Sequence, residues 1–232
     1  FKAACFAEYQ LLEPKYLVNI PKNMPELVMA QQLGTVIYGS KQLPKLEGAT
    51  VVVIGQGSVG LFHDFILRKL GASKIIAIEP IQKRLEAARQ FGVDEAIDRD
   101  GVKAIEAVLD ITNGEGADVV IEAVGSVRAM DQSLHLAKIS GKIALFGLPP
   151  TMDMVPFNWD TFFRKRLTMY AVHGAQEELG LASFHEAVNI IVNKEINLES
   201  LMTHRLPIHK ISEAFELAYC KREGVIKVSL EF

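Results

Sequence analysis

Residues 50–79 read TVVVIGQGSVGLFHDFILRKLGASKIIAIE, and the rest of the chain is organised around this stretch. Its first five residues are uncharged and β-branched, which predicts a strand buried on both faces, as in a parallel sheet. The sequence GQGSVG at 55–60 then fits the pattern G-x-G-x-x-G, and a helical apolar pattern follows it. Lys74–Ile78 predicts a second buried strand, and Glu79 stands at its end.

Each residue type in this stretch favours the binding of a dinucleotide. Gly55 allows a sharp turn out of the strand, Gly57 removes a side chain where a pyrophosphate must approach, and Gly60 permits close packing. The positive end of the following helix attracts the phosphates. Glu79 lies nineteen positions after Gly60, close to the expected spacing for an acid that accepts hydrogen bonds from both ribose hydroxyls. Because that acid would repel a 2′-phosphate, the pattern predicts NAD as the cofactor. The predicted cofactor-binding residues of the turn are Gly55, Gln56, Gly57, Ser58, Val59 and Gly60.

Composition excludes several classes of protein. The chain has 232 residues, of which 49% are hydrophobic, so a large core is available and disorder is not expected. A formal net charge of −3 argues against nucleic acid or an anionic membrane as the main partner. Cys5 and Cys220 are far apart, which excludes a disulfide framework and is typical of a reducing cytoplasm. We therefore expect a cytoplasmic protein without signal peptide or membrane-spanning segment.

The two ends of the chain have a different pattern from its middle. Phe1 is not an initiator methionine, and we expect the sequence to be the C-terminal part of a longer polypeptide. Short β-type runs at Ala7–Leu12 and Tyr16–Ile20 predict extended segments, which cannot form a sheet alone. The apolar spacing within 25–43 is helical, although Gly34 weakens it.

After Glu79 the chain alternates between helices and strands. The expected elements are a helix at 80–91, a strand at 93–97, a helix at 102–111, a strand at 117–121, a helix through Met130 and Leu134, and strands at 142–146 and 167–172. Helices at 177–193 and 211–219 and a strand at 225–230 end the chain. Such alternation predicts an α/β Rossmann fold, a doubly wound parallel sheet with helices on both faces. Ligands of such sheets bind at the carboxyl ends of the strands. That rule adds Ala123 and Val124, and then Phe146, Gly147 and Leu148, to the candidate site.

Three histidines and the two cysteines are interpreted as having no catalytic role. His63 lies in the first turn of the helix after the glycine turn, on the side away from its apolar residues, where a solvated or packing role is favoured over a catalytic one. His204 and His209 flank a predicted turn and have no neighbouring metal-ligand pattern. The cysteines are expected to be ordinary buried or half-buried thiols.

Taken together, several segments resemble the medium-chain, zinc-type alcohol dehydrogenase superfamily. They are FAEYQLLEPKYLVNIP, the LGT of 33–35, VVVIGQGSVGL, IIAIEP with Arg84, GADVVIEAVG, GKIALFGLPP and GVIKVSLEF, and they run through essentially the whole chain. The resemblance implies that 1–32 is the tail of a GroES-like catalytic segment, 33–172 an NAD-binding Rossmann domain, and 173–232 a return to the β-rich catalytic domain. It also implies that the first catalytic zinc ligands lie upstream of Phe1.

The resemblance assigns roles to residues at matching positions. Thr35 would lie beside the nicotinamide, with Val59 packed on its ring, and Arg84 would lie near the adenosine. Phe146 and Ala171 would present main-chain carbonyls to the carboxamide, and His173 its main-chain N–H. Lys227 would reach the pyrophosphate.

One position departs from the family pattern. Four residues before the threonine, where the family usually has a cysteine or glutamate at or near the catalytic zinc, this chain has Gln31. An amide oxygen is a poor zinc ligand beside thiolate or imidazole. Zinc binding could be weakened, completed by water or another residue, or absent, and these residues leave the three alternatives open.

The function implied by the resemblance is hydride transfer between NAD and the CH–OH group of an alcohol or polyol, with Zn²⁺ in the full-length protein as a Lewis acid. A small-molecule alcohol or carbonyl compound is the expected substrate, and a homodimer or homotetramer the expected assembly. The alternatives are a zinc-free quinone or enoyl reductase of the same superfamily, favoured by Gln31 but not by Gly55 and Glu79, and a non-catalytic NAD-binding module. A methyltransferase is a weaker alternative.

Overall fold

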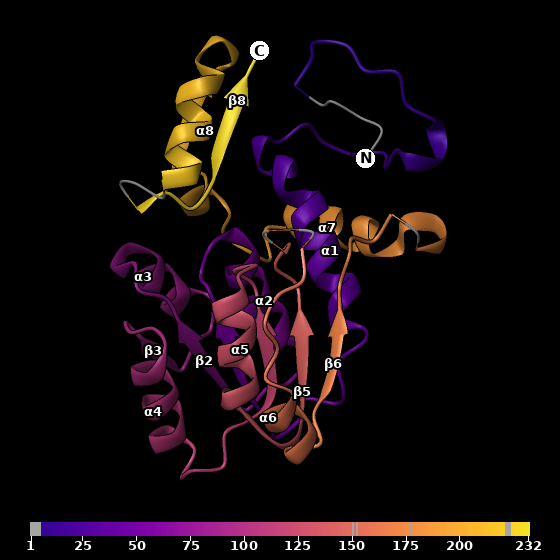
Figure 1. Ribbon diagram of the computed structural model, residues 1–232. Coiled ribbons are helices and arrows are strands. Elements are labelled where there is room, and N and C mark those ends of the chain that lie inside the picture. Colours follow the sequence, from indigo (N-terminus) through magenta and orange to yellow (C-terminus); the bar gives the residue numbers. More distant parts are fainter. Residues whose placement is uncertain (1–5, 150, 152, 177, 221–223) are drawn as a thin grey trace. The chain divides into compact units, whose positions relative to one another are not determined.

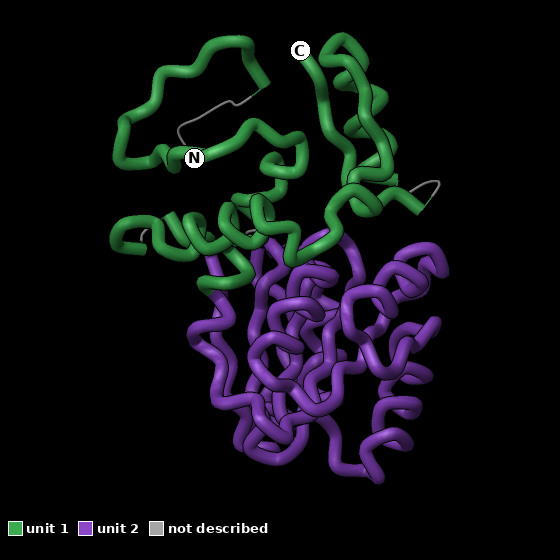
Figure 2. The backbone as a smooth tube through the Cα atoms, turned by 180° about the vertical axis from the view of Figure 1, so that it is seen from behind, with its two compact units in different colours: residues 1–38, 174–232 green, residues 39–173 purple. Residues whose placement is uncertain are grey.

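A computed structural model of the chain describes residues 6–149, 151, 153–176, 178–220 and 224–232 (Figure 1). Cys5 and Glu177, for which sequence predictions were made, lie outside the described residues. The chain divides into two compact units, one of residues 39–173 and one formed by 1–38 with 174–232 (Figure 2).

The larger unit is built on a six-stranded parallel sheet in the order β3-β2-β1-β4-β5-β6. Its strands are β1 (Thr50–Ile54), β2 (Lys74–Ile78), β3 (Glu95–Ile97), β4 (Ala117–Glu122), β5 (Ala137–Leu145) and β6 (Thr168–Ala171). Its helices are α2 (Ser58–Lys69), α3 (Gln82–Gln90), α4 (Val102–Ile111), α5 (Val127–Leu136) and α6 (Trp159–Arg164). The strand order reverses between β1 and β4, which is the switch point at which such sheets bind ligands. The predicted doubly wound α/β fold is therefore confirmed.

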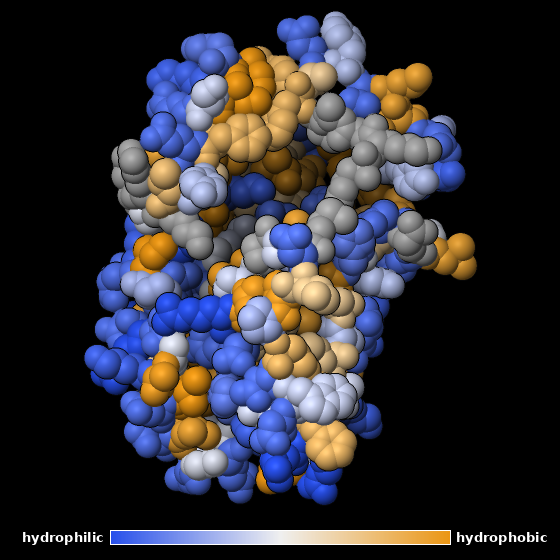
Figure 3. All heavy atoms as spheres, viewed as in Figure 1, coloured by the Kyte–Doolittle hydropathy of each residue, from blue (hydrophilic) through white to orange (hydrophobic). Residues whose placement is uncertain are grey.

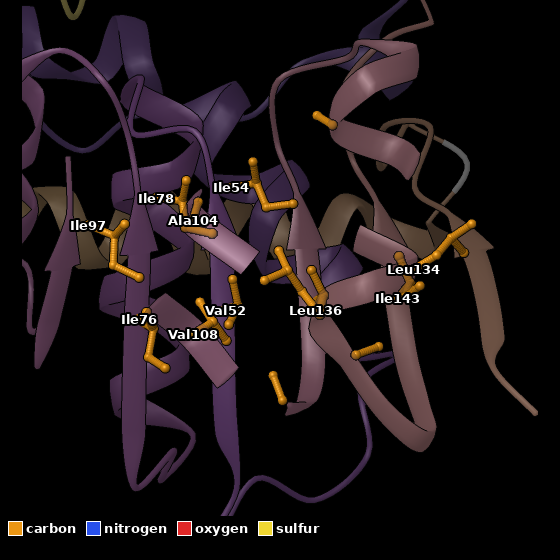
Figure 4. Packing of buried hydrophobic residues seen from close by; sticks show 14 of the residues in the cluster. Val52, Ile54, Ile76, Ile78, Ile97, Ala104, Val108, Leu134, Leu136 and Ile143 are labelled. Atoms are coloured by element: carbon orange, nitrogen blue, oxygen red, sulfur yellow. The ribbon is translucent and has the colours of Figure 1, made fainter. Parts of the chain in front are cut away.

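Successive side chains of a strand point to opposite faces of the sheet, so a strand that is apolar throughout contributes to a core on each face. Val52 and Ile54 of β1 belong to a cluster with Ala104 and Val108 of α4 and with residues of α5 (Figure 4). Val51 and Val53 belong instead to a cluster that includes Leu67 of α2. The continuous apolar run of β1 thus supplies both cores at once, as the sequence predicted.

Lys165, which follows α6 and precedes β6, is bonded to the C-terminal end of α5. Its Nζ donates to the carbonyl oxygens of His135 and Ala137 at 2.8 Å each and of Leu134 at 3.2 Å. These carbonyls lie at the C-terminal end of α5, where helical acceptors lack intrahelical donors and a cation is favoured. Partial burial lowers the pKa of Lys165.

The smaller unit holds mostly helices and one short sheet. Its elements include the 3₁₀ turns at Pro14–Tyr16 and Pro25–Met29, most of α1 (Ala30–Ser40), α7 (Ala182–Val192), β7 (His204–Pro207), α8 (Ile211–Cys220) and β8 (Val228–Glu231). Strands β7 and β8 pair in parallel. In α1, Gly34 lies against Phe184 of α7 so closely that an added Cβ would overlap the phenyl ring. The glycine that weakens the helical pattern is therefore a packing position.

Three predictions of local structure need correction, and Cys220, which was expected to be buried or half-buried, is exposed. Ala7–Leu12 and Tyr16–Ile20 form no strand in the described part of the chain, because neither run finds a partner strand and most of their side chains are exposed. The helix expected at 80–91 begins only at Gln82, since the chain is still extended at Ile81. His63 is only 2% exposed, so the solvated role expected for it is wrong and the packing role remains. Within the described residues, no helix has the length and apolar character needed to cross a membrane.

We predict that Lys165→Met lowers the free energy of unfolding by roughly 2 kcal/mol, because three carbonyls at the end of α5 lose a charged donor. Urea denaturation of the variant measures this loss. Lys103→Met, at an exposed position of α4, is the matched control and should stay within about 0.5 kcal/mol of the parent chain. Equal stability of the two variants would show that the three bonds contribute nothing.

Candidate cofactor site

The glycine turn after β1 has the backbone that its sequence requires. Gly55 has a φ of +91°, which L side chains rarely adopt, and its N–H donates to the carbonyl oxygen of Ile78 at 2.8 Å. A Cβ on Gly60 would overlap the carbonyl oxygen of Gly55, whereas a Cβ on Gly57 would meet no atom within 4 Å. The third glycine thus lets α2 approach the turn, and the second leaves open space beside the main chain, as the approach of a pyrophosphate requires.

Helix α2 begins inside this turn. Its first intrahelical bond runs from the N–H of Leu61 to the carbonyl oxygen of Gly57 at 3.1 Å. The N–H groups of the residues before Leu61 therefore stand outside the hydrogen-bond ladder of α2, at the positive end of its dipole. Ser58 and Val59 lie in this first turn. This arrangement suits an anionic ligand.

Glu79 connects the glycine turn to the start of α3. Its Oε2 accepts from the N–H of Gln56 at 2.8 Å, and its Oε1 accepts from the N–H of Ile81 at 3.0 Å. Arg84 Nη1 lies 3.9 Å from Oε2 of Glu79, and both side chains are almost fully buried. Burial lowers the pKa of Arg84, and the charge of Glu79 partly offsets this. Glu79 therefore holds the turn in place in addition to any contact with a ribose.

Glu122, at the end of β4, is a residue that the sequence analysis did not assign to the site. Its Oε1 accepts from the N–H groups of Val124 and Gly125 at 2.8 Å each. Its main-chain oxygen accepts from the N–H groups of Phe146 at 2.8 Å and Gly147 at 3.0 Å. Burial raises the pKa of Glu122, and the amides that bind it partly offset this effect. The sequence signal that could have identified Glu122 is an acidic residue at the end of a predicted buried strand.

The ends of β4, β5 and β6 enclose a pocket of about 300 Å³. Glu122 lines it together with Ala171 and His173, which were predicted to contact the carboxamide, and with Gly147 and Leu148, which were predicted from their position after a strand end. Ala123 lies at the same edge, since its N–H donates to the carbonyl oxygen of Ile54 at 3.0 Å. Val124 and Phe146 also follow the ends of β4 and β5, but they and Ala123 do not line this pocket.

Thr35, Gln31 and Lys227 belong to the smaller unit. Thr35 Oγ1 donates to the carbonyl oxygen of Gln31 at 3.0 Å, and Gln31 Nε2 donates to Thr35 Oγ1 at 3.2 Å. Lys227 Nζ donates to Oε1 of Gln32 at 3.1 Å, and burial lowers its pKa. The two predicted residues of α1 are therefore bonded to each other, one helical turn apart.

The described residues do not fit a zinc site. Among them, no group of three or more His, Cys, Asp or Glu side chains could hold a metal ion. Gln31, at the usual zinc position, has its amide nitrogen bonded to Thr35 and offers at most an uncharged oxygen. We therefore derive no catalytic step through zinc.

Two ionisable side chains of α2 are buried without hydrogen-bond partners among the described residues. Neither ring nitrogen of His63 and neither carboxyl oxygen of Asp64 has a partner, and the amide of Gln56 is also unsatisfied. Burial lowers the pKa of His63 to about 3 and raises that of Asp64 well above its usual value, an effect that the nearby Gln56 side chain partly offsets. Such groups cost stability, and buried polar side chains of this kind concentrate at functional sites.

Known proteins are similar to this chain in sequence and in fold. The family model described as zinc-binding dehydrogenase matches residues 58–193. An L-threonine 3-dehydrogenase of Pyrococcus horikoshii is 28% identical over 229 residues, which cover 97% of this chain and 64% of the relative. The crystal structure of an alcohol dehydrogenase from Thermotoga maritima is similar with a TM-score of 0.77 and 29% identity, over 95% of this chain and 59% of that one. At 20% identity, a zinc-binding dehydrogenase structure from Sinorhizobium meliloti bound to NADP shares the fold, with a TM-score of 0.78 over 91% of this chain and 61% of that one.

The chain belongs to the zinc-binding dehydrogenase family, since the family model covers more than half of it. It spans less than two thirds of the length of the curated relative from Pyrococcus horikoshii.

The buried pair of α2 predicts a pH dependence of stability with opposite signs for its two members. The pKa of His63 falls from 6.5 to about 3 on folding, so only the unfolded chain takes up a proton between these values. Within this window the free energy of unfolding decreases by about 1.4 kcal/mol for each unit by which the pH is lowered, and His63→Phe should remove that loss. The raised pKa of Asp64 has the reverse effect, because stability is lost as pH rises above its usual 3.8.

Asp64→Asn should therefore increase stability at neutral pH, while His63→Phe should do so only in acid. Thermal unfolding of both variants across the acid to neutral range checks this. Parallel stability curves for the two variants and the parent chain would contradict the assignment.

Proposed function

We propose that this chain supplies the cofactor site of an NAD-dependent oxidoreductase that moves hydride between the nicotinamide and the CH–OH group of an alcohol or polyol. The observation that carries the proposal is Glu79, a buried carboxylate at the end of β2 that lies against the glycine turn through the N–H of Gln56 at 2.8 Å. A carboxylate there can bind both hydroxyls of an adenosine ribose and repels a 2′-phosphate. Family membership and the named activities of the relatives support the reaction class.

The residues of this chain have separate tasks in the proposed reaction. The first turn of α2 binds the pyrophosphate through its N–H groups. Glu79 orients the adenosine ribose, with Arg84 beside it. At the other end, Phe146, Ala171 and His173 present main-chain groups to the carboxamide, so that the nicotinamide ring is held in one orientation. Orientation of this kind is what the protein contributes to hydride transfer, because the chemistry belongs to the cofactor.

A zinc-free reductase of the same superfamily is the second candidate. The observation that favours it is Gln31, whose amide is bonded to Thr35 and which lacks the charge of a usual zinc ligand. A substrate whose oxygen is not held by metal would then be polarised by hydrogen bonds alone. Gly55 and Glu79 favour the first candidate, because quinone and enoyl reductases usually prefer NADPH and often have alanine at the first glycine. A non-catalytic NAD-binding module would share the cofactor preference and lack turnover.

The proposed homodimer or homotetramer has a candidate surface on the larger unit. Strand β6 is the last strand of the sheet, so one of its edges is unpaired among the described residues. Trp159 and Phe163 of α6, which is followed by β6, are 64% and 68% exposed. Figure 3 shows apolar side chains among hydrophilic ones on the face that carries α5 and α6. Edge strands and exposed aromatic groups are common in interfaces between copies.

Glu79→Gln tests the proposed cofactor preference. The substitution keeps an oxygen that can accept one of the two amide bonds but removes the charge, so it should reduce the preference for NADH over NADPH by about 10- to 100-fold. Fluorescence titration of the chain with each cofactor measures this. Glu86→Gln, the same change at an exposed position of α3, is the matched control and should leave the preference unchanged.

The result is informative in either direction. Equal binding of NADH and NADPH by the parent chain, or a clear preference for NADPH, would contradict the NAD assignment and favour the reductase. An unchanged preference in Glu79→Gln would remove the role given to this carboxylate.

The proposed assembly predicts that the chain sediments as a dimer or larger at micromolar concentration. Trp159→Ser combined with Phe163→Ser should shift it toward the monomer, because the two exposed rings would lose their contacts across the interface. Analytical ultracentrifugation measures the shift. A monomeric parent chain would overturn the proposal for this surface.

A further inference from the structure

His63 makes a contact with the ring of another aromatic residue, Phe146. Its imidazole lies edge-on to the ring of Phe146, with centroids 4.8 Å apart and an angle of 87° between the planes. This is the T-shaped arrangement that aromatic pairs favour. The imidazole is only 2% exposed, and neither of its nitrogens has a hydrogen-bond partner among the described residues. The contact is therefore made by the two aromatic rings, without a hydrogen bond of the imidazole.

The main chain at Phe146 is bonded to the end of β4. The N–H groups of Phe146 and Gly147 both donate to the carbonyl oxygen of Glu122, at 2.8 and 3.0 Å. In a trans peptide the C=O and N–H point in opposite directions, and the described chain has no cis peptide. The carbonyl of Phe146 shares a peptide plane with the N–H of Gly147, so it points away from Glu122. The bonds to β4 thus set the direction of this carbonyl.

The side chain of Phe146, in contrast, contacts α2 through the ring of His63. Gly147 follows Phe146 and has no side chain that could anchor the turn, and an added Cβ there would overlap the main chain of Gly125. The phenyl ring of Phe146 is only partly buried. His63 therefore supplies the aromatic contact that limits how far this ring can move toward α2.

We propose that His63 is a positioning residue, which holds Phe146 by an edge-on ring contact and so holds the main-chain carbonyl that receives the nicotinamide carboxamide. This inference rests on the proposed function. It gives a role to the buried aromatic ring of His63, which lies in the same helix as the N–H groups that are proposed to bind the pyrophosphate. His63 touches no cofactor atom in this account.

The role predicts an effect on one half of the cofactor only. ADP-ribose contains the adenosine, pyrophosphate and second ribose of NADH but no nicotinamide. His63→Ala should weaken NADH binding by about tenfold, equivalent to one lost hydrogen bond, and change ADP-ribose binding by less than about twofold. His63→Leu, which fills most of the space without a flat ring, should act in the same direction and serves if the alanine variant does not fold. Isothermal titration of the 232-residue chain with both ligands measures the ratio.

Two further variants separate positioning from general loosening of α2. His63→Phe keeps a ring at the contact and should restore the parent ratio of NADH to ADP-ribose affinity. Ile66→Ala opens a cavity one turn further along α2, so it should lower stability without changing the ratio.

Each outcome decides the question. Equal weakening of both ligands by His63→Ala, failure of His63→Phe to restore the ratio, or the same ratio change in Ile66→Ala would each overturn the positioning role. If the parent chain binds neither NADH nor ADP-ribose, the proposed function fails, and the inference fails with it. Binding of both ligands with an unchanged ratio in His63→Ala and His63→Leu overturns the inference alone.

Discussion

The hydrogen bond from the N–H of Gln56 to Glu79 is the contact on which the arrangement of the site depends. It joins the turn after β1 to the end of β2 at 2.8 Å, and the other carboxylate oxygen reaches the start of α3. A residue expected to recognise a ribose is thereby also part of the scaffold. Exchange of Glu79 for a short polar residue would therefore alter the turn as well as the charge, so a clean change of cofactor preference requires a side chain that still reaches these amides.

Glu122 repeats this use of a buried acid one strand away. Its carboxylate binds the amides of Val124 and Gly125, and its main-chain oxygen binds those of Phe146 and Gly147. The ends of β4 and β5 are thus held by one residue, and the ends of β1 and β2 by another. Amides that would otherwise be unsatisfied at the strand ends are bonded, and the loops that follow are fixed without any ligand.

The sequence was most informative where local pattern and tertiary structure agree. The bounds of β1, β2 and α4 were predicted to the residue, because buried parallel strands and an amphipathic helix leave strong periodic signals. The turn after β1 was predicted because a fixed spacing of glycines carries a fixed geometry, and the contact of Glu79 with a ribose stays a prediction. His63 was misplaced, since a polar residue in a helix is usually exposed, and α2 is covered on nearly every side. Glu122 was missed because it binds the N–H groups of Phe146 and Gly147, which only the fold brings close to it. The runs at 7–20 have strand composition without strand partners, which no single segment can reveal.

The contact between Gly34 and Phe184 has a consequence for how this sequence can vary. The ring of Phe184 fills the space in which any side chain at position 34 would stand. Within α1 and α7 the two positions are therefore not independent: alanine at 34 becomes acceptable only after the residue at 184 has become smaller, and a smaller residue at 184 alone leaves a cavity. Substitutions at these positions should be inherited as pairs, in that order, along any lineage that departs from glycine.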